Sequence, residues 1–151
     1  MICVVQRVSS ASVTVGEDVV GQIAAGMLVL AAVQHDDTEA DIFWTASKLC
    51  GLRIFRNEDK YFDFDVKEAG GSVLLVSNFT VAASTRRGRR PSLDGAATPE
   101  LGHRLFDQLI REVRAAGLTV ATGQFGAEMK VQLVNDGPVT FLVDSREARH
   151  G

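Results

Sequence analysis

The chain has 151 residues, of which 46% are hydrophobic and 23% are charged, and its formal net charge is −3. These values are typical of one globular domain with its own core, and they argue against a protein that coats nucleic acid through a broad basic face. No apolar run approaches the roughly 20 residues that span a bilayer, and Met1–Val5 lacks the charged region of a signal peptide. A cytoplasmic protein without a membrane partner is therefore expected.

The first part of the chain is rich in strand patterns. Residues 2–8 and 11–15 alternate between apolar and polar side chains well enough to predict two strands. A Gly-Glu-Asp turn at 16–18 leads into 19–23, which predicts a hairpin. The continuous apolar run 27–33 predicts a buried strand.

The middle of the chain is predicted to hold one helix and a central strand. Thr38 is a suitable N-cap with Asp41 at the third helical position, and apolar residues then recur with helical periodicity to about Leu49. Beyond this helix, the sequence predicts a short strand at 52–55, a turn at 57–60 and a central strand at 73–79.

The last part of the chain begins with a polar, arginine-rich segment, 82–98, that is predicted to be a loop. Thr98 and Pro99 have the pattern of an N-cap and a first-turn proline, and the amphipathic helix that follows ends at Gly117. Strands are expected at 118–122, 129–134 and 139–143, and residues 145–151 are expected to form a polar, frayed tail.

These elements predict a single α+β domain over residues 1–144. About eight strands would form mostly antiparallel sheets that curl toward a barrel, with two helices covering them. Cys3 and Cys50 are interpreted as packing residues, because two cysteines do not make a disulfide framework. No His, Cys or carboxylate cluster has metal-ligand spacing, so neither a metal nor another cofactor is expected.

Two polar stretches stand out because each lies where a strand pattern ends or breaks. Ser77–Val81 reads Ser-Asn-Phe-Thr-Val and follows a buried apolar run, and Asn135–Thr140 reads Asn-Asp-Gly-Pro-Val-Thr between two apolar runs. Polar residues at the end of a buried strand lie at the rim of a sheet, where a ligand can reach them. A Gly-Pro step restricts the backbone and removes one N–H donor.

Both stretches resemble the signature of the D-aminoacyl-tRNA deacylases, the D-Tyr-tRNA deacylase family, whose usual forms are Ser-Gln-Phe-Thr-Leu and Asn-x-Gly-Pro-Val-Thr. The second stretch matches fully, whereas the first departs at Asn78 and Val81. Further segments similar to the family follow in the same order: Val5–Val8, Ala11–Val13, Leu52–Phe55, Gly88–Ser92 and Gly123–Ala127.

The resemblance implies an ester hydrolase that releases D-amino acids from the 3′ end of aminoacylated tRNA. It implies a homodimer in which a cis Gly137-Pro138 peptide of one subunit enters the pocket of the other and excludes L-aminoacyl-tRNA. Arg7 matches the arginine that braces this wall. A wall made of backbone atoms would clash with the side chain of an L-amino acid. Glycine has no side chain that could clash, so tRNA-Ala mischarged with glycine is a further expected substrate. The simpler interpretations are a turn for Gly-Pro and a surface residue for Arg7.

The candidate catalytic residues are Ser77, Asn78, Phe79 and Thr80. An activated ester requires few side chains, because a positioned water and donors aimed at the oxyanion are sufficient. The resemblance implies that backbone N–H groups, here those of Asn78 and Phe79, hold the ester, and that the neighbouring ribose hydroxyl helps to move a proton. Simpler roles remain open: a strand-end hydroxyl for Thr80 and core packing for Phe79.

A Ser/Thr–His–Asp triad is poorly supported by the sequence. The chain has three histidines, His35, His103 and His150, and none lies in a motif with a partner. Thr80 is therefore expected to line the site without forming a covalent intermediate.

The candidate substrate-binding residues fall in two segments. Phe125, Ala127 and Met129 lie in a stretch that resembles the adenine pocket of the family, where an aromatic ring can stack on a terminal base. Arg87 and Arg89 belong to an arginine cluster suited to phosphates of the acceptor stem. Core packing for Met129 and a solvated loop for the arginines are the alternatives.

Two other functions remain open at this stage. One is a related deacylase of relaxed chirality that removes small, mischarged L-residues, and the other is a catalytically weak binder of tRNA 3′ ends, for which Asn78 and Val81 are the argument. DNA is not an expected partner.

Overall fold

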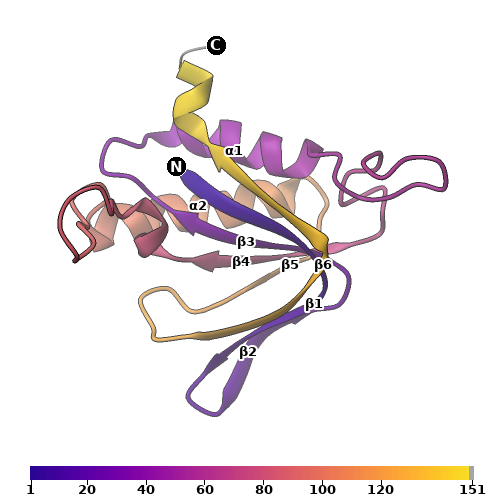
Figure 1. Cartoon of the computed structure of the whole chain (residues 1–151), viewed down its shortest axis with the longest axis horizontal. Coiled ribbons are helices and arrows are strands. Elements are labelled where there is room, and N and C mark those ends of the chain that lie inside the picture. The colour runs from indigo at the N-terminus through magenta and orange to yellow at the C-terminus, as the bar shows by residue number, and fades with distance from the viewer. Residues whose placement is uncertain (150–151) are drawn as a thin grey trace.

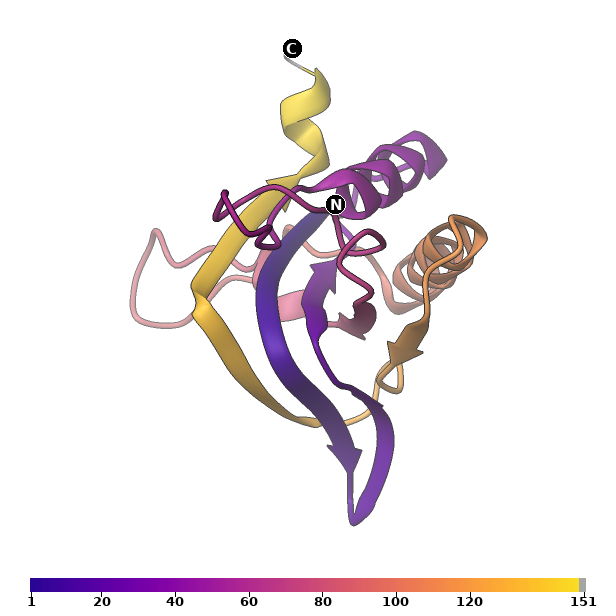
Figure 2. The same cartoon turned by 90° about the vertical axis from the view of Figure 1, so that its right-hand side faces the viewer.

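The sheet of this computed structural model, which describes residues 1–149, is organised around one long strand, β1 (Ile2–Val15). β1 pairs antiparallel with β2 (Asp18–Ile23), β3 (Gly26–Ala32) and β6 (Lys130–Asp144). β3 runs parallel to β4 (Ser72–Ser77), and β4 runs parallel to the short β5 (Val120–Thr122). The sheet curls until β2 approaches β5, where Gly21 lies against the carbonyl of Thr122 (Figure 2). The result is a mixed sheet nearly closed into a barrel.

Two helices, α1 (Glu39–Gly51) and α2 (Pro99–Ala115), pack against each other and cover one face of the sheet (Figure 1). Both begin as the sequence predicts. The N–H of Thr38 donates to Asp41 Oδ2 at 2.9 Å, and the Thr98 hydroxyl accepts from the N–H of Leu101 at 3.3 Å. Two short 3₁₀ helices, η1 (Phe79–Ala82) and η2 (Ser145–Arg149), follow β4 and β6.

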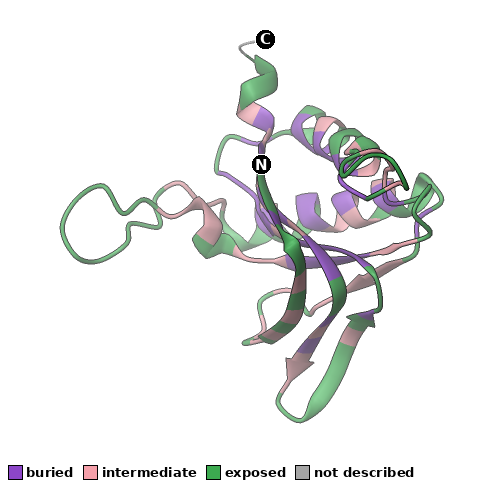
Figure 3. Cartoon of the chain, turned by 45° about the vertical axis from the view of Figure 1, so that its right-hand side comes forward, coloured by how far each residue is buried: buried purple, intermediate pink, exposed green. Residues whose placement is uncertain are grey.

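The apolar runs of β3 and β4 are buried because both faces of these strands are covered (Figure 3). Val29 and Leu75 face a cluster under the helices, and Leu28 and Leu74 face a second cluster inside the curl of the sheet. This double burial fixes the end of β4, and hence the polar stretch that begins at Ser77, relative to the rest of the domain.

The predicted α+β class, the two helices and the curled sheet are confirmed, but the strand count is lower. Segments 2–8 and 11–15 form one strand, as do segments 129–134 and 139–143, and the sheet has six strands. Residues 52–55 are not a strand, because only Phe55 forms an isolated bridge, with Phe64. The strand predicted at 73–79 ends at Ser77 and turns into η1.

The tail is ordered as far as Arg149, in contrast to the frayed tail that its composition predicts. The Ser145 hydroxyl donates to Asp41 Oδ1 at 2.8 Å, and Arg149 Nη2 lies 2.8 Å from both carboxylate oxygens of Asp41. Residues 150–151, including His150, lie outside the described part of the chain. No helix within residues 1–149 is long and apolar enough to cross a membrane.

Candidate active site

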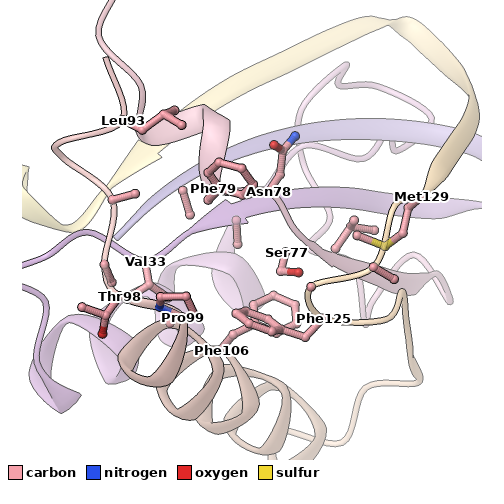
Figure 4. Close-up of a pocket in the computed structure, with 18 of the residues that line it drawn as sticks. Val33, Ser77, Asn78, Phe79, Leu93, Thr98, Pro99, Phe106, Phe125 and Met129 are labelled. Atoms are coloured by element: carbon pink, nitrogen blue, oxygen red, sulfur yellow. The ribbon is translucent and has the colours of Figure 1, made fainter. Parts of the chain in front are cut away.

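A pocket of about 570 Å³ opens where the parallel strands β3 and β4 end. The ends of these strands and η1 form one side, and α2 and the segment before it form another (Figure 4). The turn after β5 and the start of β6 complete the wall. The lining residues are Ala31–Val33, Val76–Phe79, Leu93, Ala96–Pro99, Gly102, Phe106, Phe125–Ala127, Met129 and Val131.

None of the side chains that line this pocket is charged at neutral pH. The polar ones are those of Ser77, Asn78 and Thr98, and the rest are apolar or glycine. Such a pocket accommodates an uncharged organic group and orients it through a few hydroxyl, amide and backbone groups. A general base, if the reaction needs one, has to come from outside this lining.

The start of η1 presents backbone donors at the end of β4. The N–H of Asn78 donates to the Ala31 carbonyl at 2.8 Å and is therefore already engaged, which differs from the donor role expected for it. The N–H groups of Phe79 and Thr80 belong to the first turn of η1, and within residues 1–149 they donate to no protein acceptor. These two groups can therefore donate to a ligand at the end of β4.

The hydroxyl of Thr80 is held by its neighbour. It donates to the Asn78 side-chain carbonyl at 2.6 Å, and this is its only side-chain partner within residues 1–149. An amide oxygen does not accept a proton at neutral pH in the way that an imidazole does, so the contact orients the hydroxyl without activating it. Thr80 itself is exposed and does not line the pocket.

Phe125 forms the aromatic wall of the pocket opposite η1. Its ring stacks on His103 of α2 with centroids 4.6 Å apart and planes 6° apart, and it also contacts Phe106. Met129 is partly buried against the inner cluster, and its sulfur accepts a hydrogen bond from the N–H of Gln124 at 3.4 Å. Both residues therefore pack against the core and present a surface to the pocket.

The Asn-Asp-Gly-Pro-Val-Thr stretch forms a bulge in β6. β1 pairs with β6 on both sides of it, at Val8 with Asn135 and at Gln6 with Thr140, and the intervening residues 136–139 loop out opposite Arg7. The Asn135 side chain closes the base of the bulge. It accepts from the N–H of Val139 at 3.0 Å and donates to the Thr140 hydroxyl at 2.9 Å.

The geometry of the bulge accounts for the glycine at position 137 and for the buried arginine at position 7. Gly137 has φ +143° and a cis peptide bond to Pro138, and a Cβ built on it would lie 2.6 Å from Val139 Cγ2, so only glycine fits. Arg7 is 2% exposed and donates from Nε to the Asp136 carbonyl at 3.0 Å and from Nη1 to the Ile54 carbonyl at 2.8 Å. Arg7 is thus a buried brace of the bulge and not a surface residue.

Apart from Thr80, which does not line the pocket, the predicted site residues fall into three groups in the structure. Ser77, Asn78 and Phe79 line one pocket together with Phe125, Ala127 and Met129. Arg7, Gly137 and Pro138 meet at the bulge, which does not line the pocket of its own chain. Arg87 and Arg89 lie on an exposed loop that the paired Ser84 and Ser92 close at its neck, and it projects from the body of the domain (Figure 1).

The histidines do not build a triad within residues 1–149. His35 and His103 are exposed, neither lines the pocket, and His103 pairs with Asp107 at 3.3 Å. His150 lies outside the described residues. No group of three His, Cys, Asp or Glu side chains in the described part of the chain is arranged to hold a metal ion.

Several site residues were not found by sequence reasoning. Ala31–Val33 lie at the pocket because β3 ends there, and the strand-end argument used for Ser77 applies equally to that run. Tyr61 accepts a hydrogen bond from Arg7 and lies beside Gly137, and it comes from a loop far away in the sequence. No local pattern points to that contact.

Comparisons with known families and proteins identify related chains. The family model described as D-Tyr-tRNA(Tyr) deacylase matches residues 4–144. A D-aminoacyl-tRNA deacylase from Herpetosiphon aurantiacus is 50% identical over 100% of this chain and 99% of its own length. One from Opitutus terrae is 51% identical over 96% of this chain and 97% of its own.

Two solved structures have the same fold. The first, named "c-Myc DNA Unwinding Element Binding Protein", is 32% identical with a TM-score of 0.90 and covers 95% of this chain and 98% of its own. The second, described as a probable eukaryotic D-amino acid tRNA deacylase, has a TM-score of 0.82 at 17% identity, covering 94% of this chain and 97% of its own.

Proposed function

We propose that this chain, which belongs to the D-Tyr-tRNA deacylase family and is an ester hydrolase acting on D-aminoacyl-tRNA, works without a catalytic side chain. The observation that carries the proposal is the pocket lining, in which every side chain is uncharged and free backbone N–H groups stand at one edge. The substrate then has to supply the group that moves the proton.

The reaction proposed is attack of water on the carbonyl carbon of the aminoacyl ester. The N–H groups of Phe79 and Thr80 donate to the developing oxyanion, and the carbon–oxygen bond to the ribose 3′-oxygen breaks. The 2′-hydroxyl beside that bond relays the proton that water loses to the departing 3′-oxygen. Asn78 contributes by holding the Thr80 hydroxyl at 2.6 Å and by tying η1 to β3.

The tRNA end is proposed to bind across the same pocket. The terminal adenine stacks on Phe125, with Ala127 and Met129 beside it, because these residues line the wall opposite η1. Arg87 and Arg89 contact phosphates of the acceptor stem. Their loop adjoins Leu93, a pocket residue, and within the described residues neither arginine forms an ion pair.

Chiral selection is proposed to come from a second copy of the chain. The bulge at Gly137-Pro138 is exposed and does not line its own pocket, so it can act as a wall only in the pocket of a partner. β6 carries exposed apolar side chains on either side of the bulge, Val134 at 56% and Leu142 at 70%, which favours burial of this strand in a homodimer. Glycyl-tRNA misacylated on tRNA-Ala is accepted because glycine presents no side chain to the wall.

The activity is tested with D-Tyr-tRNA and L-Tyr-tRNA. We expect the wild-type protein to deacylate only the first, and a protein that clears neither would be a binder of tRNA ends. Clearance of both, or of L-Ala-tRNA, would indicate a deacylase of relaxed chirality.

The shared site is tested with mixed dimers. One subunit carries Ala97→Trp to fill its pocket, and the other carries Pro138→Ala in its bulge. If the wall acts between subunits, the one open pocket faces a wild-type bulge, and the mixed dimer hydrolyses D-Tyr-tRNA but not L-Tyr-tRNA. A fully active monomer by light scattering at micromolar concentration would contradict the shared site.

A further inference from the structure

Tyr61 stands against the bulge that the proposed function assigns to chiral selection. Its hydroxyl accepts a hydrogen bond from Arg7 Nη2 at 3.0 Å, and it lies 3.1 Å from the position that a Cβ on Gly137 would occupy. The hydroxyl therefore binds the arginine that braces the bulge and occupies the space beside Gly137 that a side chain there would need.

The ring of Tyr61 contacts three side chains, in addition to the hydrogen bond that its hydroxyl accepts. The guanidinium carbons of Arg7 and Arg56 lie 4.8 and 4.7 Å from the ring centroid, within the range of cation–π attraction. The ring also meets Phe62 edge-on at 4.8 Å, and Phe62 meets Phe141 at 5.7 Å. Phe141 directly follows Thr140, so an aromatic chain joins the loop of Tyr61 to β6 just beyond the bulge.

The loop that carries Tyr61 is itself fixed at both ends. Phe55 and Phe64 exchange backbone hydrogen bonds of 3.0 and 2.9 Å, and Asn57 and Lys60 close the turn at its tip. Arg7 joins the loop to the bulge, because Nη1 binds the Ile54 carbonyl and Nε binds the Asp136 carbonyl. The Tyr61 hydroxyl accepts a hydrogen bond from Nη2, the third nitrogen of the same guanidinium.

We propose that Tyr61 is a positioning residue for chiral selection. It sets the orientation of Arg7 and the position of the Gly137 backbone, and thereby how far the bulge projects from β6. This inference rests on the proposed function of the bulge as a wall. A residue with this role affects the rejection of L-substrates and leaves the hydrolysis of D-substrates nearly unchanged, because it does not line the pocket of its own chain, where the ester-binding residues lie.

The test compares Tyr61→Phe and Tyr61→Leu with Phe43→Leu. Phe43 is a matched control, because it is 48% exposed on α1 whereas Tyr61 is 45% exposed. Removal of a hydrogen bond to a charged group should raise kcat/KM for L-Tyr-tRNA about tenfold in Tyr61→Phe, and Tyr61→Leu should raise it further. Phe43→Leu should change neither substrate's kcat/KM. A Tyr61→Leu variant that remains folded with an unchanged ratio of D to L hydrolysis would overturn the proposal.

A second measurement uses the fact that Tyr61 is the only tyrosine of the chain. Fluorotyrosine incorporated into the full-length protein therefore gives one ¹⁹F signal, and we expect Arg7→Lys to shift it and Phe43→Leu to leave it in place. An unshifted signal in Arg7→Lys would contradict the contact. If Pro138→Ala also leaves the D to L ratio unchanged, the wall itself is refuted. If Pro138→Ala relaxes the ratio and the Tyr61 variants do not, only the role of Tyr61 fails.

Discussion

Asn135 offers the sharpest test of how the bulge is built. Asn135→Ala removes the acceptor of the Val139 N–H and the donor to the Thr140 hydroxyl. Val139 is 4% exposed, so its N–H would be left buried without a partner, whereas the bond to Thr140 is exposed and contributes little. We expect the variant to lose about 2 kcal/mol of unfolding free energy, which lowers the Tm of a chain of this size by about 4–8 °C.

The assay pairs thermal unfolding with deacylation of D- and L-Tyr-tRNA. Asn135→Asp is the conservative control, because a carboxylate still accepts from Val139 and the Thr140 hydroxyl can donate to it. Gln132→Ala, an exposed position on the same strand, should lie within about 0.5 kcal/mol of the wild type. Of these three variants, we expect only Asn135→Ala to have a lower Tm and also to hydrolyse L-Tyr-tRNA. An unchanged Tm would refute the account of the bulge, and a lower Tm with full rejection of L-Tyr-tRNA would separate the bulge from chirality.

Two further predictions concern η1 and the anchored tail. Thr80→Ala should keep at least about a tenth of the wild-type rate, because loss of a true general acid or base costs about 10²–10⁴-fold; a trapped acyl-enzyme would show the opposite. Burial acts to raise the pKa of Asp41, but the hydrogen bonds that it accepts outweigh this and lower that pKa. A lowered pKa stabilises the fold above the unfolded value of about 4, and the effect is lost as the pH falls through the folded value. Arg149→Ala should therefore destabilise the protein to urea at pH ~7 and less so at pH ~3; equal losses at both would contradict the pairing.

The sequence located much of the pocket, for physical reasons that are local. Ser77 ends an apolar run that only a doubly covered strand can bury, so its polar successors had to lie at a rim. Phe125 lies among glycines, which predicts an exposed turn and not a core strand. The resemblance then placed these two segments in one site, and the pocket contains both.

The remainder depended on contacts that no local pattern contains. The N–H of Asn78 is engaged by Ala31, and this follows only from the parallel register of β3 and β4. β6 continues through Gly137-Pro138 because β1 pairs with it on both sides, although the Gly-Pro step predicts a break. Tyr61 and Arg7 are 54 positions apart, and nothing in either segment shows that they meet.

The central claim is that the substrate, and not a protein side chain, handles the proton. D-Tyr-tRNA ending in 2′-deoxyadenosine tests it directly, with binding to the protein measured separately. We predict normal binding and a rate of hydrolysis reduced by about 10²–10⁴-fold. Hydrolysis of this substrate at the normal rate would contradict the account and return attention to the hydroxyls of Ser77 and Thr80.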